Sequence, residues 1–263
     1  MNVLPAVQAE LASATNQLLA TAASLSDADV AAPSLLPGWS RGHVLAHLAG
    51  NAASHLNLLT WARTGVRTPQ YSSAESRNAE IEAVAARPAA AHLAALEDSA
   101  GRLAAAFRDL PGEAWSAPVE GMRPPPHPAW YLLVRRLREV AVHHVDLGAG
   151  YRPSDWPEPF VRRELHDCRL SWPYERSTVS EIILTGEPQQ RWQNLGKGPA
   201  VRGAPADMLA WLTGRSDGEG VTLVPAGQSS PPGAGGAVLP EPPPWLSMPA
   251  PADLPATPPE DYP

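Results

Sequence analysis

Histidine and glutamate residues at helical spacing are the features of this sequence that could do chemistry. Glu139 and His143 are four residues apart, and His43 and His47 repeat that spacing earlier in the chain. Residues four apart lie on one face of an α-helix. If two such helices pack together, their nitrogen and oxygen donors can meet. Zinc accepts such ligands, and catalytic zinc sites commonly use three of them with one position left open.

The neighbouring residues have more than one interpretation. A single histidine on an apolar helix face is commonly a packed core residue, and a glutamate–histidine pair at this spacing is commonly a surface pair. His144 lies about 100° around the helix from His143, which favours a supporting, substrate-facing or structural role. Asp146 either orients a histidine ring by a hydrogen bond or ends the helix. His43 suits a metal ligand or a surface residue.

Composition excludes several classes of protein. The 263 residues carry a net charge of -7 with no long basic run, which argues against a nucleic-acid partner or an anionic membrane. Cys168 is the only cysteine, so a zinc site made of several thiolates is excluded. Arginine-rich usage with Lys197 as the only lysine suggests a high-GC, actinobacterial source. We find neither a signal-peptide pattern nor a membrane-spanning run and expect a cytoplasmic protein, a monomer.

Helical periodicity dominates the first 150 residues. It predicts four segments, 5–25, 41–63, 72–110 with a break at Arg87 and Pro88, and 129–147. Ser40 is the expected N-cap of the second segment. Four helices with modest connections predict an antiparallel four-helix bundle over residues 1–150.

The pattern changes after residue 150. Short β-like runs at 181–184 and 220–224 flank a helix that begins at Pro205 and ends before Gly214. We therefore expect an α+β two-domain protein, with a small C-terminal α/β domain over residues 151–246. The proline-rich residues 247–263 are expected to form a disordered tail.

Four runs of this sequence resemble the mycothiol-dependent maleylpyruvate isomerases, a family of the DinB-like metalloenzyme superfamily. The runs are LPGWSRGHVLAHLAGNA at 36–52, REVAVHHVDLG at 138–148, RGAPADMLAWLTGR at 202–215 and LPEPPPWL at 239–246. The resemblance covers nearly the whole chain up to residue 247. It implies a four-helix bundle followed by a small α/β domain.

The resemblance also implies roles for particular residues. The family's zinc ligands correspond to His47, Glu139 and His143. The family's C-terminal domain supplies an arginine to the active-site cleft, for which Arg215 is the best match, although an arginine after a helix also suits a plain C-terminal cation. With Arg215, we name His144 as a candidate catalytic residue.

The activity implied is the conversion of maleylpyruvate to fumarylpyruvate in the gentisate route of aromatic degradation. A cis double bond conjugated to a carbonyl rotates only after a nucleophile adds to it, and the thiol of mycothiol can add and leave reversibly. Zinc (or another divalent metal) would lower the pKa of that thiol. Two alternatives remain, namely a mycothiol S-transferase acting on other electrophiles and a non-catalytic metal-binding or regulatory protein.

Overall fold

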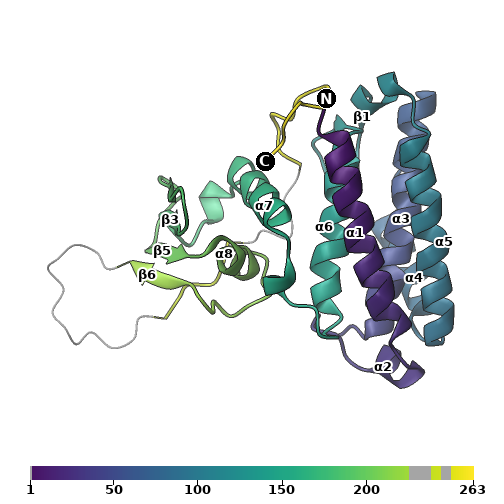
Figure 1. Ribbon diagram of the computed structural model, residues 1–263, viewed down its shortest axis with the longest axis horizontal. Coiled ribbons are helices and arrows are strands. Elements are labelled where there is room, and N and C mark those ends of the chain that lie inside the picture. The colour runs from purple at the N-terminus through teal and green to yellow at the C-terminus, as the bar shows by residue number, and fades with distance from the viewer. Residues whose placement is uncertain (1, 225–237, 244–249) are drawn as a thin grey trace, which may run out of the picture. The chain divides into compact units, whose positions relative to one another are not determined.

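The computed structural model describes residues 2–224, 238–243 and 250–263, and it has a mixed α+β fold (Figure 1). The chain divides into two compact units. The first contains the chain up to Tyr151 and also Asp253–Tyr262, and the second contains Arg152–Ala252. The predicted end of the second domain, at residue 246, lies outside the described residues. None of the helices in the described ranges is long and apolar enough to cross a membrane.

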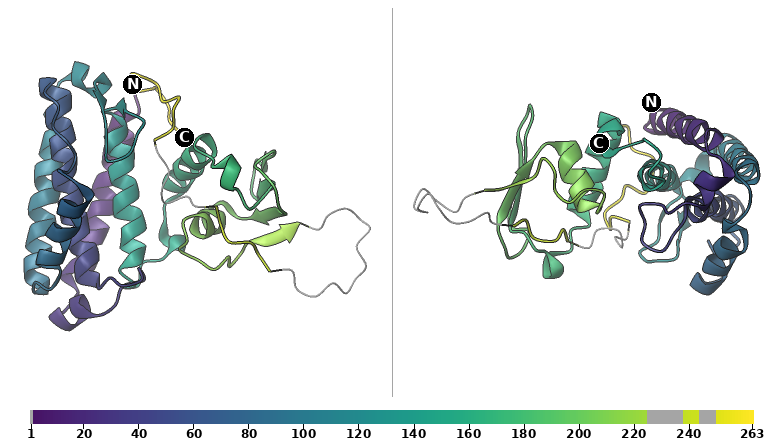
Figure 2. Two further views of the ribbon diagram at one scale, coloured as in Figure 1. Left: turned by 180° about the vertical axis from the view of Figure 1, so that it is seen from behind. Right: turned by 90° about the horizontal axis from the view of Figure 1, so that it is seen from below.

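The first unit is built from helices that pack side by side (Figures 1 and 2). Helix α3 packs against α4, α5 and α6, and α1 packs against α5 and α6. The helices are α1 (Leu4–Ala23), α2 (Asp27–Ala31), α3 (Arg41–Thr64), α4 (Ala74–Ala85), α5 (Ala89–Arg108) and α6 (Tyr131–Asp146). A 3-10 turn (Gly112–Ser116) and two short paired strands, β1 (Pro118–Val119) and β2 (His127–Pro128), precede α6.

Local sequence signals explain where these helices begin and end. Ser40 is the N-cap of α3, as predicted, and its hydroxyl accepts a hydrogen bond from the backbone of His43. Gly65 ends α3 with a positive φ of 70°. The predicted break in the third segment separates α4 from α5, because Pro88 lies at the N-cap of α5 and cannot continue α4.

A glycine brings α4 close to α3. A Cβ atom at Gly42 would collide with the backbone oxygen of Ala85, so a side chain there would force the two helices apart. The close approach matters for the site described below, because α4 carries Arg77 and α3 carries His47.

The second unit is a small sheet covered by helices. The strand order is β4-β3-β5-β6, with β3 and β5 parallel and the outer pairs antiparallel. Helices α7 and α8 pack against each other and lie on one face of the sheet in Figure 2. The elements are two 3-10 turns (Pro153–Asp155 and Tyr174–Arg176), α7 (Glu158–Leu170), β3 (Glu181–Leu184), β4 (Gln190–Trp192), β5 (Ala200–Gly203), α8 (Pro205–Leu212) and β6 (Thr222–Val224).

Residues 250–263 of the tail that was predicted to be disordered are described by the structure, whereas 247–249 lie outside the described residues. Residues 253–262 pack on the first unit, where the Trp130 indole donates a hydrogen bond to the backbone oxygen of Pro255 at 2.8 Å. The backbone nitrogen of Val3 donates to Pro259 at 2.9 Å, and the buried Tyr262 ring lies 5.1 Å from that of Trp130. Proline restricts the unfolded chain, so a proline-rich segment loses little conformational entropy on docking.

Candidate metal centre

The structure brings together His47 from α3 and both Glu139 and His143 from α6. One potential ligand atom from each residue lies within 4.8 Å of the other two. The Nε2 atoms of His47 and His143 lie 2.9 Å and 3.4 Å from Glu139 Oε2. Two nitrogens and one carboxylate oxygen at this spacing are a donor set that suits a divalent metal such as zinc.

Burial differs among the three side chains. That of His47 is only 5% exposed, whereas those of Glu139 and His143 are 28% and 19% exposed. The cluster therefore has a buried member on α3 and two partly exposed members on α6.

The charges of the cluster follow from its contacts. Burial lowers the pKa of His47 to about 4, so this ring is neutral near pH 7. Burial alone would raise the pKa of Glu139, but hydrogen bonds from His143 and His47 outweigh it and hold that pKa well below its usual range. Burial opposes charge on His143, yet the carboxylates of Asp146 and Glu139 raise its pKa.

Asp146 orients one ring of the cluster. Its Oδ2 atom lies 2.8 Å from Nδ1 of His143, and a carboxylate can only accept this hydrogen bond. His143 therefore carries a proton on Nδ1 and turns Nε2 toward Glu139. Carboxylates commonly support metal-binding histidines in this way, so Asp146 fits the orienting role that the sequence suggested.

The other histidines near the cluster have separate partners. His43 accepts a hydrogen bond from the Ser40 backbone through Nδ1, and its Nε2 lies 3.3 Å from Glu82. His144 is buried, with Nε2 2.7 Å from the hydroxyl of Thr21. Its ring also stacks on Tyr151, with the centroids 3.9 Å apart. Neither residue belongs to the group of three.

Arg215 and Cys168 lie in the second unit. The Arg215 guanidinium donates a hydrogen bond to the backbone oxygen of Thr213 at 2.6 Å, just after α8. Cys168 is fully buried on α7.

Sequence analysis did not single out two residues beside the cluster. Arg77 on α4 places NH2 3.1 Å from Nδ1 of His47, and Tyr71 lies in the preceding loop with Arg77 6.0 Å from its ring centre. With His47 they line a cavity of about 190 Å³ between α3, α4 and α5. Neither has a spacing relation to the histidine pairs, so no local pattern could reveal them.

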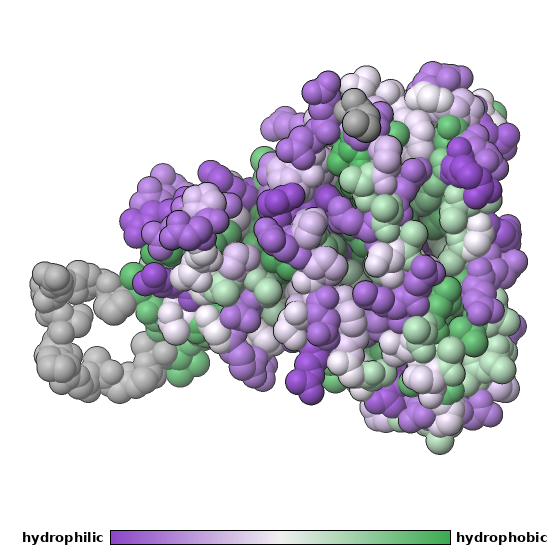
Figure 3. All heavy atoms as spheres, in the orientation of Figure 1, coloured by the Kyte–Doolittle hydropathy of each residue, from purple (hydrophilic) through white to green (hydrophobic). Residues whose placement is uncertain are grey.

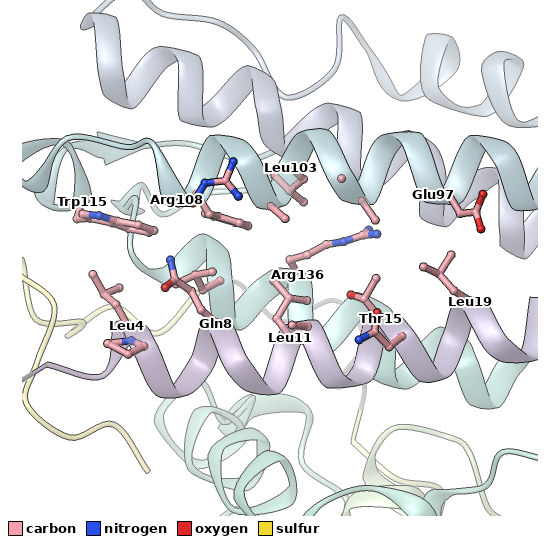
Figure 4. Close-up of a pocket in the computed structure, with 18 of the residues that line it drawn as sticks. Leu4, Gln8, Leu11, Thr15, Leu19, Glu97, Leu103, Arg108, Trp115 and Arg136 are labelled. Carbon is pink, nitrogen blue, oxygen red and sulfur yellow. The ribbon is translucent and has the colours of Figure 1, made fainter.

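A larger cavity, of about 760 Å³, lies between α1, α5 and α6 (Figure 4) and contains none of the three cluster residues. Its walls are mainly apolar, including Leu11, Leu103 and Phe107, and apolar residues follow the furrow between α1 and α5 in Figure 3. Arg136 crosses it, but NH1 donates hydrogen bonds to Leu48 O and Asn51 Oδ1 at 3.0 and 2.7 Å. This arginine thus joins α6 to α3.

Comparison with known proteins agrees with this architecture. Residues 11–148 match the family described as the mycothiol maleylpyruvate isomerase N-terminal domain. The crystal structures of the mycothiol-dependent maleylpyruvate isomerase and of a point mutant of it are each 30% identical to this chain, with a TM-score of 0.79. Each match covers 91% of this chain and 96% of the other. No curated protein matches. The chain belongs to the mycothiol-dependent maleylpyruvate isomerase family.

Proposed function

We propose that this protein converts maleylpyruvate to fumarylpyruvate by reversible thiolate addition, with mycothiol as the thiol and zinc held by His47, Glu139 and His143. The observation that carries the proposal is the meeting of these three donors in a chain that belongs to this family. We propose further that the helical unit is a DinB-like four-helix bundle and that residues 151–246 form the small C-terminal α/β domain.

The residues of the chain support this chemistry in distinct ways. When bound, the metal would lower the pKa of the thiol so that thiolate exists at neutral pH. Asp146 holds the proton of the neutral His143 ring on Nδ1, which leaves Nε2 with a lone pair to offer, and burial keeps the His47 ring uncharged. The partly exposed side of Glu139 and His143 leaves an approach for the reactants.

We assign a carboxylate of the substrate to Arg215, because arginine binds carboxylates through paired hydrogen bonds. The Arg215 side chain bonds to the carbonyl of Thr213, which uses part of the donor capacity of its guanidinium. His144 contacts Thr21 and Tyr151, and we propose for it a supporting rather than a substrate-contacting role.

The test is an assay of the purified full chain with maleylpyruvate, following the trans product with and without mycothiol and after zinc removal and restoration. Product formation that requires both mycothiol and metal is the expected result. Turnover of other electrophiles with mycothiol, but not of maleylpyruvate, would instead favour a mycothiol S-transferase. Tight zinc binding without any effect of mycothiol on the melting temperature would favour a non-catalytic metal-binding protein.

A further inference from the structure

Arg77 holds the buried ring of the candidate metal centre in a particular tautomer. Its NH2 group lies 3.1 Å from Nδ1 of His47. Arginine can only donate hydrogen bonds, so Nδ1 of His47 must be the acceptor. The proton of this neutral ring is then on Nε2, where it points to Glu139 Oε2 at 2.9 Å.

This tautomer is opposite to the one that metal binding needs. The Nε2 atom of His47 faces Glu139 and His143 and would be the metal ligand, so it must lose its proton. In a neutral ring the proton then resides on Nδ1. This atom, which accepted the hydrogen bond from Arg77, has then become a donor. Two donors cannot form a hydrogen bond with each other. The positive charge of the guanidinium would also be repelled by a divalent cation bound to the same ring. Metal binding and the contact between Arg77 and His47 therefore exclude each other.

The cavity beside His47 gives the released guanidinium a place to act. Its volume of about 190 Å³ would hold roughly six water molecules or one small organic acid. The charged side chains that line it are those of Arg77, Arg87 and Glu80, and Glu80 already accepts a hydrogen bond from Ser76 at 2.9 Å. The cavity therefore has an excess of positive charge.

Tyr71 places a second hydrogen-bonding group beside this cavity. Its hydroxyl oxygen is buried and makes no hydrogen bond of good geometry among the described residues, with Ser54 and Arg77 as its polar neighbours. A buried hydroxyl with poorly formed hydrogen bonds costs free energy, and a carboxylate held by Arg77 would accept its proton. The Arg77 guanidinium already lies near this ring, 6.0 Å from its centre.

We propose that Arg77 is a substrate-binding residue that metal binding releases from His47, and that it then holds a substrate carboxylate together with the Tyr71 hydroxyl. The inference rests on the proposed function, because it takes the metal centre and a dicarboxylate substrate from it. A dicarboxylate has two anionic ends, and Arg77 would bind one of them.

The first experiment measures zinc affinity by competition with a chromogenic chelator for the full chain, Arg77→Ala and the control Arg63→Ala. Arg63 is an exposed cation near the end of α3, outside the cavity. Arg77→Ala should bind zinc roughly three- to tenfold more tightly, because one hydrogen bond no longer opposes binding, and Arg63→Ala should match the wild type. If Arg77 only oriented the His47 ring for metal binding, its replacement would have the opposite effect and lower the zinc affinity roughly 10- to 100-fold. Weaker or unchanged affinity in Arg77→Ala would overturn the proposal.

The second experiment measures calorimetric binding of succinate, an unreactive dicarboxylate, to the zinc-loaded protein. Arg77→Ala should weaken binding roughly 10- to 150-fold and Tyr71→Phe roughly fivefold, as expected for charged and neutral hydrogen bonds. Arg63→Ala should not change it, and metal-free wild type should bind more weakly than the zinc-loaded form. No succinate binding by the wild type, or equal binding by Arg77→Ala, would overturn the proposal.

Neither measurement needs turnover, so the two hypotheses can fail separately. If both results are as expected but maleylpyruvate is not isomerised with mycothiol, the proposed function fails and the role of Arg77 in binding a dicarboxylate stands. If the wild type binds no zinc, both fail. If it binds zinc and isomerises maleylpyruvate while Arg77→Ala behaves like Arg63→Ala, only the inference about Arg77 fails.

Discussion

The two units of this protein hold their candidate functional side chains in different ways. In the first unit, His47, Glu139 and His143 bond to one another across two helices that are far apart in sequence. In the second unit, Arg215 donates to the backbone of its own turn, two residues away. A cluster made by tertiary packing depends on every member and on the helices beneath it. The contact of Arg215 with Thr213 depends only on the local turn that follows α8.

The largest expected effect is the loss of metal from the first unit when one ligand of the cluster is replaced. His47→Ala or His143→Ala leaves two ligands of three, too few for tight binding, and should strip the metal from the purified protein. Elemental analysis of the full chain measures this. His43→Ala is the matched control, because His43 lies on the same helix but contacts Ser40 and Glu82. Full zinc retention in both ligand variants would refute the ligand assignment.

The next effect concerns the helices beneath the cluster. Arg136→Met removes the donor for Leu48 O and Asn51 Oδ1, both on α3, and deprives the buried Asn51 side chain of its 2.7 Å hydrogen bond. The free energy of unfolding should fall by roughly 2–5 kcal/mol, measured by urea denaturation. The control is Arg108→Met. Arg108 lines the same cavity from an exposed position, so its replacement should change the free energy of unfolding by less than about 0.5 kcal/mol. Equal stabilities for the two variants would remove the structural role given to Arg136.

Arg215→Ala tests the second unit. If this residue binds a substrate carboxylate, kcat/KM should fall roughly 10- to 150-fold, the value of a charge-assisted hydrogen bond. Zinc content and melting temperature should hardly change, and Arg215→Lys should recover only part of the activity because an ammonium lacks the planar fork. Wild-type efficiency in Arg215→Ala would leave this residue with a structural role.

Acid should destabilise the first unit through its buried histidines. Burial lowers the pKa of His55 to about 3, and burial with the nearby Arg135 does the same for His127. Between these values and the unfolded pKa near 6.5, the unfolded chain binds more protons, so stability falls as the pH falls. Each group contributes a slope of about 1.4 kcal/mol per pH unit in this window. Denaturation of metal-free His55→Gln from pH 6.5 to 4 should give a shallower slope than wild type, and an identical slope would contradict the assignment.

The smallest effect is expected at Cys168. This fully buried side chain packs on α7 in the second unit, and the proposed mechanism takes its sulfur from mycothiol. Cys168→Ala should keep kcat/KM close to the wild-type value at saturating mycothiol. A folded variant with no turnover would show that the thiol comes from the protein and would exclude the mechanism proposed here.

Sequence patterns predicted the long helices and, in the second unit, the strands β3 and β6 and the helix α8, but they missed the shortest strands. The breaks at Gly65 and Pro88 follow from backbone restrictions of single residues, so they are visible locally. The paired strands β1 and β2 contain only two residues each and have no periodicity to detect. The packing of Tyr262 on Trp130 was missed because it joins distant segments of the chain.

The sequence by itself determined that Glu139 and His143 share one helix face, because the 3.6-residue period leaves no other arrangement. It also indicated that a histidine of the second predicted helix would join them, and the resemblance favoured His47. Tertiary structure decided the rest. Ser40 and Glu82 engage His43, packing turns His47 toward Glu139, and the close approach of α4 at Gly42 brings Arg77 to the far side of the His47 ring. These contacts depend on distances between helices, which no local spacing in the sequence contains.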